Sequence, residues 1–136
     1  MTNVETETQP GPSNLFGPAD GPAGVATDDP STYELGVRFT ASADGVVDSL
    51  RYYRGAADAG DTDIRTLNIW TDQGVRLGSV QVRSDAGDSG WQVGTLASGV
   101  ALEAGQTYVV SYGTQQNYAY SGGFFASPWS GPDGTL

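Results

Sequence analysis

Three aspartates in one short stretch are the residues whose spacing best suits metal chemistry. Asp58, Asp61 and Asp63 stand in "DAGDTD". Calcium takes about six to eight oxygen ligands, and carboxylates supply them. The stretch does not match an EF-hand loop, because it has no Gly at the sixth position and no closing Glu. Two interpretations therefore stay open: a calcium site, and a solvated acidic loop that binds no ion.

Aromatic residues form the second set that suits binding chemistry. Sugars present C–H faces that stack on Trp and Tyr rings, while polar side chains bond the sugar hydroxyls. A shallow site with such rings is therefore what a carbohydrate-binding domain would need. The candidate rings are Trp70, Tyr53, Tyr118, Tyr120 and Trp91.

Each ring also has a structural explanation. Trp91 starts a strand after a Gly, and Trp commonly fills the space between two sheets, so we favour a core position for it. Trp70 shares a strand face with Asn68 and fits either a surface platform or a place under a loop. Tyr118 and Tyr120 share one face of a predicted strand and could simply cover the end of the domain.

The composition argues against catalysis. The chain of 136 residues has no His and no Cys, which removes the commonest general base and any thiol nucleophile. It has no "GxSxG" elbow and no phosphate-binding glycine loop. Its Asp pairs stand in polar turns, without the apolar surroundings that a proton-donating carboxyl requires. We expect a non-catalytic domain with no cofactor apart from the calcium considered above.

The charge balance limits the partners. Acidic residues outnumber basic ones 16 to 6, which gives a net charge of −10. Such a field repels phosphate backbones and anionic lipids, so we expect neither nucleic-acid binding nor membrane insertion. The partners that fit are a polysaccharide or other glycan, and further domains of the same parent chain. We expect the domain itself to be a monomer.

Short strands must hold these residues in place. In "YELGVRFTA" the residues Leu35, Val37 and Phe39 alternate with polar ones, which predicts one buried and one exposed face. The apolar spacing slips between Val47 and Leu50, which predicts a bulge, and "DQG" predicts a tight hairpin. Further strands are predicted at "IRTLNIWT", "VRLGSVQV", "WQVGTL" and "VALEAGQTYVVSY".

One segment predicts how the strands are connected. "LEAGQTYVVSY", Leu102–Tyr112, is similar to the tyrosine corner of Greek-key sandwiches. We expect the chain to cross between sheets at Ala104-Gly105, and the hydroxyl of Tyr108 to bond back onto that crossing. Because no segment shows helical periodicity, the predicted fold class is all-β. The expected architecture is a Greek-key β-sandwich, immunoglobulin-like or carbohydrate-binding-module-like.

Several stretches together resemble a known family. "LGVRFTASADGVVDSLRYYRGAADAGDT", "LNIWTDQGVRLGSV", "SGWQVGTLASGVALEAGQTYVVSY" and "NYAYSGGFF" look like successive motifs of the domain-of-unknown-function 4082 family, over about residues 33–125. The resemblance implies a β-sandwich module of large exported bacterial proteins, beside immunoglobulin-like repeats and enzymes that act on sugars. It implies no activity of its own.

The chain departs from the family pattern at two places. Family members often carry a His near the position of Arg65, and another near Gly113 or Asn117. This chain has neither, so no role of those histidines is carried over. The family pattern also places the pair Phe124-Phe125 in a final strand, where one ring faces the core and the other covers an edge or the N-terminal arm.

The chain is predicted to have three parts. Residues 1–30 form a Pro/Gly-rich N-terminal arm or linker, residues 31–127 form the sandwich, and residues 128–136 form a C-terminal linker. Within the arm, the apolar pair Leu15-Phe16 is expected to pack as a short arm or edge strand.

The predicted function combines the rings with the family resemblance. We expect a non-catalytic accessory module of an exported bacterial protein, located outside the cell or on its surface, that binds carbohydrate through exposed aromatic residues. The alternative is a structural spacer or adhesin stalk domain without a ligand site.

Overall fold

Eight strands make up the regular structure of the described residues. The computed structural model describes residues 14–17, 19–26, 31–56, 64–114 and 118–120; for 24–26 and 118–120 it describes the backbone alone. The strands are β1 (Gly24–Ala26), β2 (Glu34–Thr40), β3 (Gly45–Arg54), β4 (Ile64–Thr71), β5 (Arg76–Arg83), β6 (Gly90–Leu102), β7 (Thr107–Gly113) and β8 (Tyr118–Tyr120). Across these residues, no helix has the length and apolar character needed to span a membrane.

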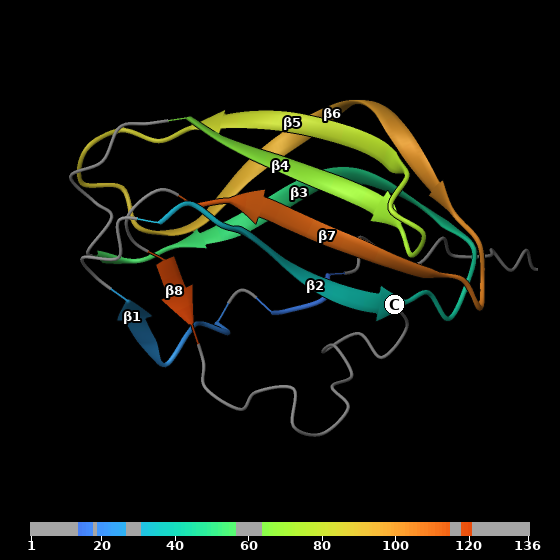
Figure 1. The fold of residues 1–136 in the computed structure, drawn as a ribbon, viewed down its shortest axis with the longest axis horizontal. Helices are drawn as coiled ribbons and strands as arrows, with labels where there is room; N and C mark the ends of the chain where they lie inside the picture. Colours follow the sequence, from blue (N-terminus) through green and yellow to red (C-terminus); the bar gives the residue numbers. More distant parts are fainter. Residues whose placement is uncertain (1–13, 18, 27–30, 57–63, 115–117, 121–136) are drawn as a thin grey trace, which may run out of the picture.

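Two antiparallel sheets face each other. One has four strands in the order β2-β7-β4-β5, and the other pairs β3 with β6. Figure 1 shows the four-stranded sheet in front of the β3–β6 pair, with the short β1–β8 pair at the lower left. The chain changes sheet between β2 and β3, β3 and β4, β5 and β6, and β6 and β7. The predicted all-β sandwich is therefore confirmed.

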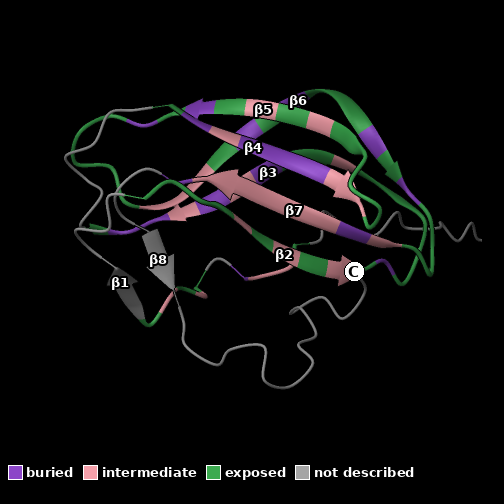
Figure 2. Cartoon of the chain, in the orientation of Figure 1, coloured by how far each residue is buried: buried purple, intermediate pink, exposed green. Residues whose placement is uncertain are grey.

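Alternation of side chains builds the core between the sheets. On β4, Leu67 and Ile69 are fully buried, and on β3 Leu50 and Tyr52 face them. Figure 2 shows the burial concentrated along β4, while β2 alternates between exposed and half-buried residues. Removing apolar surface of this kind from water is the main favourable term in folding. The core thus occupies the inner faces and leaves both outer faces for other uses.

Glycines let the sheets come close together on one side. A Cβ atom on Gly94 of β6 would lie 2.7 Å from Val82 and 2.9 Å from Val80, both on β5. A Cβ atom on Gly78 of β5 would lie 3.0 Å from Val100 of β6. The missing side chains therefore let β6 lie directly over β5.

Two local predictions are confirmed and one is wrong. The register of β3 against β6 shifts between Val47 and Ser49, where the bulge was expected. Gly74, with φ of 89°, closes the hairpin between β4 and β5. The expected separation of "WQVGTL" from the following segment does not occur. Strand β6 instead runs without a break from Gly90 to Leu102. It pairs with β3 on both sides of the register shift, so the irregularity does not divide it into two strands.

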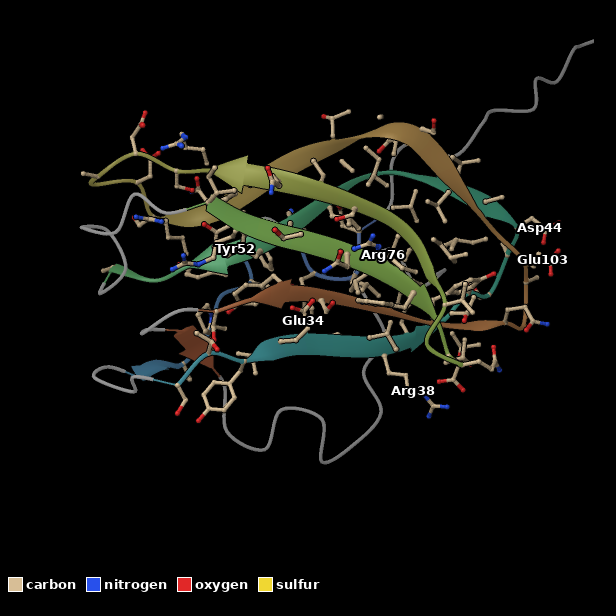
Figure 3. All side chains as sticks on the ribbon, turned by 45° about the horizontal axis from the view of Figure 1, so that its top comes forward. Glu34, Arg38, Asp44, Tyr52, Arg76 and Glu103 are labelled. Atoms are coloured by element: carbon tan, nitrogen blue, oxygen red, sulfur yellow. The ribbon has the colours of Figure 1, made fainter. Side chains whose placement is uncertain are left out.

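The tyrosine corner forms as predicted. The hydroxyl of Tyr108 accepts a hydrogen bond of 2.9 Å from the backbone N–H of Glu103. The crossing is tied to the start of β3 as well, because Ala104 N–H donates to Asp44 Oδ1 at 2.8 Å. Figure 3 shows Asp44 and Glu103 together at this end of the molecule. Gly105, with φ of 83°, supplies the left-handed residue that the turn needs.

We expect Tyr108→Phe to lower the free energy of unfolding by about 1–3 kcal/mol, because the partly buried Glu103 N–H then loses its acceptor. Chemical denaturation of the variant and the parent protein measures this. Tyr53→Phe is the matched control, since no described residue hydrogen-bonds to the Tyr53 hydroxyl. Equal losses in the two variants would contradict a structural role for the corner.

Gly94→Ala tests the close approach of β6 to β5. The added methyl group would collide with Val80 and Val82, so we expect a loss of about 1–3 kcal/mol and a lower melting temperature. Gly45→Ala is the control, because its new Cβ meets no atom within 4 Å. If Gly94→Ala and Gly45→Ala had the same melting temperature, the close approach of the two strands would not contribute to stability.

Candidate functional site

The predicted rings do not gather on one surface. Trp70 lies on the outer face of the four-stranded sheet, because it alternates with the buried Ile69. Tyr53 and Trp91 are paired partners on β3 and β6, on the outer face of the other sheet. The side chains of Tyr118 and Tyr120 lie outside the described residues; their backbone pairs with β1. The structure therefore divides the candidates between opposite sides of the sandwich.

A chain of hydrogen bonds surrounds Trp70. The indole Nε1–H donates to Ser111 Oγ at 2.8 Å, and the Ser111 hydroxyl donates to Glu34 Oε1 at 2.6 Å. Asn68 Nδ2 donates to the same carboxylate oxygen at 2.9 Å. We call these four residues the Glu34–Trp70 site. The arrangement holds a carboxylate and an indole ring at fixed positions on one sheet face.

Strand pairing explains how residues distant in sequence meet here. Asn68 on β4 pairs with Ser111 on β7, and Glu34 on β2 pairs with Gly113 on β7. A Cβ atom on Gly113 would lie 3.5 Å from Glu34 Oε2, so the carboxylate lies across the bare backbone of β7. This is how a side chain of the edge strand β2 reaches Asn68 two strands away.

The site presents one carboxylate oxygen for a ligand. Both hydrogen bonds to Glu34 end on Oε1, and no described residue donates to Oε2. Glu34 is solvent-exposed. Asn68 is buried, with 6% of its surface exposed, and holds the carboxylate through its hydrogen bond. An oriented carboxylate of this kind accepts hydrogen bonds from hydroxyl or ammonium groups.

Two arginines border the same sheet. Arg76 on β5 is the register partner of Trp70, and Figure 3 shows it together with Glu34 at the front of the molecule. Arg38 on β2 donates from Nε to Asp72 Oδ1 at 2.6 Å and from Nη2 to Asp72 Oδ2 at 2.7 Å. This bidentate bond raises the pKa of Arg38 and lowers the pKa of Asp72. Because the Asp72 pKa is depressed, the pair is intact above the ordinary Asp pKa and is lost as acid protonates Asp72.

The second ring cluster is covered by the chain itself. Tyr53 meets Trp91 edge-on, with ring centroids 5.4 Å apart, and Phe16 stacks on Trp91 at 6.1 Å. The core position favoured for Trp91 is wrong: the residue is half-buried on the outer face, because Gln92 and Gly94 take the inward positions of β6. The two rings are steeply inclined to each other, so they do not form one flat platform.

Sequence reasoning missed Glu34, Ser111 and the role of Asn68. Asn68 was correctly expected to share the face of Trp70, and Glu34 is one of the polar residues that alternate with Leu35, Val37 and Phe39. The missing information was the pairing of β7 with both β2 and β4, which no local pattern contains. The local pattern in β7, a Ser at 111 and a Gly at 113, is too common in strands to indicate a site.

Several predictions fall outside the described residues. These are the calcium ligands Asp58, Asp61 and Asp63, and the pair Phe124-Phe125. Within the described ranges no group of three acidic, His or Cys residues could hold a metal. Calcium binding therefore stays a prediction.

Two buried arginines lie on either side of the predicted calcium loop in sequence. Arg54 ends β3 with 0% exposure, and Arg65 near the start of β4 has 2%. Guanidinium groups stay charged at any physiological pH, and buried charges require partners. This burial was not anticipated from the sequence.

Comparison with known proteins gives the family. The family model described as "Domain of unknown function (DUF4082)" matches residues 19–135. The chain is thus an all-β sandwich module, and it belongs to the DUF4082 family. The match begins inside the segment predicted as an arm, which contains β1. No curated protein and no solved structure matched the chain.

Ser111→Ala tests the hydrogen-bonded chain. We expect the NMR signal of the Trp70 indole N–H to shift and the unfolding free energy to fall by about 0.5–1.5 kcal/mol, because Trp70 loses its acceptor and Glu34 loses a donor. Ser79→Ala is the control, since Ser79 is exposed on β5 opposite Asn68. An unchanged indole signal in Ser111→Ala would contradict the bond.

Proposed function

We propose that this chain is a non-catalytic, carbohydrate-binding module of an exported bacterial protein, and that sugar binds at the Glu34–Trp70 site. The observation that carries the proposal is the Glu34 carboxylate, held by Ser111 and Asn68 beside the half-exposed indole of Trp70. The ring supplies a stacking surface for the C–H face of a sugar, and Glu34 Oε2 accepts from its hydroxyls.

The open form of the site suits a polymeric ligand. Glu34, Trp70 and Ser111 lie on the outer face of a sheet rather than in a closed cavity, so a sugar chain can extend beyond them at both ends. The groups are also preorganised by hydrogen bonds, which reduces the entropy lost on binding. A neutral glycan avoids repulsion by the net charge of −10.

The same geometry argues against glycoside hydrolysis at this surface. That reaction generally uses two carboxyl groups on either side of the bond that breaks. Glu34 is the one carboxylate among the four residues of the site, and Asp72, on the hairpin after β4, is held by Arg38 in a bidentate bond. Binding without chemistry is therefore the function that these residues support best.

A structural spacer is the second candidate, and the other sheet favours it. Two of the predicted sugar-stacking rings contact the N-terminal region. Trp91 stacks with Phe16, and Tyr53 lies against Gly21. On that face the aromatic residues hold the chain's own backbone. A domain whose rings are all used in this way would need no ligand.

A glycan array with the chain, followed by titration calorimetry on any hit, tests the binding proposal. We expect Trp70→Ala and Glu34→Gln each to weaken binding at least about tenfold, equivalent to roughly 1.4 kcal/mol. Val93→Ala is the control, because Val93 is exposed on the opposite sheet. Circular dichroism checks that each variant keeps its strand content.

Two results would count against the proposal. Binding that survives both substitutions would place the sugar site away from the Glu34–Trp70 site. A blank array at high protein concentration would favour the spacer.

A further inference from the structure

The outer face of the β3–β6 pair has the features of a peptide-binding surface. Arg51 and Tyr53 of β3 stand opposite Val93 and Trp91 of β6. The Arg51 guanidinium carbon lies 4.4 Å from the centroid of the Trp91 ring, which is a cation–π contact. Stacked Arg and Trp side chains beside a Tyr ring form a rigid surface with hydrogen-bond donors at its edges.

Residues 14–17 and 19–23, here called the N-terminal segment, lie on this surface. Phe16 stacks on Trp91 with ring planes 20° apart. Gly21 lies against the ring of Tyr53, since a Cβ atom there would be 3.4 Å from it. One aromatic anchor and one glycine contact thus fit the two rings.

Backbone carbonyls of the segment receive the remaining contacts. Arg51 donates to the carbonyl oxygen of Phe16, and Trp91 Nε1–H donates to that of Asp20 at 3.0 Å. Burial lowers the pKa of Arg51, and the nearby charge of Asp20 opposes that shift. Side-chain donors that bind main-chain oxygens recognise a peptide by its path rather than by its full sequence.

The segment carries its own internal structure. Gly17 N–H donates to Asp20 Oδ2 at 2.7 Å, and Asp20 N–H donates back to Gly17 O at 3.1 Å. These two bonds lie within the segment and close the turn between the Phe16 and Asp20 carbonyls. A preorganised turn loses less entropy on docking than a free peptide does.

We propose that the Arg51–Tyr53–Trp91 face is a docking surface for this segment, and that the N-terminal segment of a second copy of the chain can replace the chain's own. An identical segment makes identical contacts, so the two arrangements differ mainly in how the segment is tethered. A short tether holds its ligand at an effective concentration of about millimolar. Exchange between copies therefore becomes significant as the protein approaches that concentration, or when the tethered segment is weakened.

The first experiment uses the full chain carrying Phe16→Ala and a synthetic peptide with the sequence of residues 14–26, NLFGPADGPAGVA. We expect the peptide to bind saturably and to restore the NMR shift of the Trp91 indole N–H, which Trp91→Phe assigns. A peptide with Ala in place of Phe16 is the matched control and should bind at least about tenfold more weakly. No saturable shift at millimolar peptide would overturn the docking proposal.

The second experiment uses the unaltered chain, so it remains decisive if Phe16→Ala fails to fold. Labelled and unlabelled protein are mixed at about millimolar concentration, and isotope-filtered NMR looks for contacts between Phe16 of one copy and Trp91 of another. Light scattering should show dimers that dissociate when the peptide is added. A protein that stays monomeric, with no such contacts between copies, would overturn the exchange.

Discussion

The position of β7 between β2 and β4 is the constraint on which the outer sheet surface depends. Antiparallel pairing fixes which residues stand opposite each other, and a shift of one residue would turn Ser111 into the core. Tyr108 lies near the start of β7, and its hydrogen bond with Glu103 ties the strand to the crossing from β6. One local hydrogen bond and one register therefore determine where Glu34, Ser111 and Trp70 meet.

Local patterns were enough to predict much of the fold, since alternation, turn residues and the tyrosine corner all act over a few positions. Trp70 and Asn68 were placed on one strand face because alternate residues of a strand share a face, and the buried Leu67 and Ile69 lie on the other face. Trp91 was misplaced because its size suggested the core, whereas the inward positions beside it are filled by smaller residues.

The candidate site was only partly predictable because it is built across strands. Trp70 could be found from its type, but Glu34 comes from a strand that is not adjacent to β4 in the sheet. Its carboxylate reaches Asn68 because Gly113 lacks a side chain. Contacts of this kind depend on long-range pairing and on an absent atom, and neither leaves a local pattern in the sequence.

The edge strands of the four-stranded sheet have a consequence for crowded surroundings. β2 carries Glu34 and Arg38, and β5 begins and ends with Arg76 and Arg83. Charged side chains on an edge make it costly for two sheets to join into a continuous ladder. Many copies held near one another, as in tandem arrays, can therefore resist aggregation through their sheet edges.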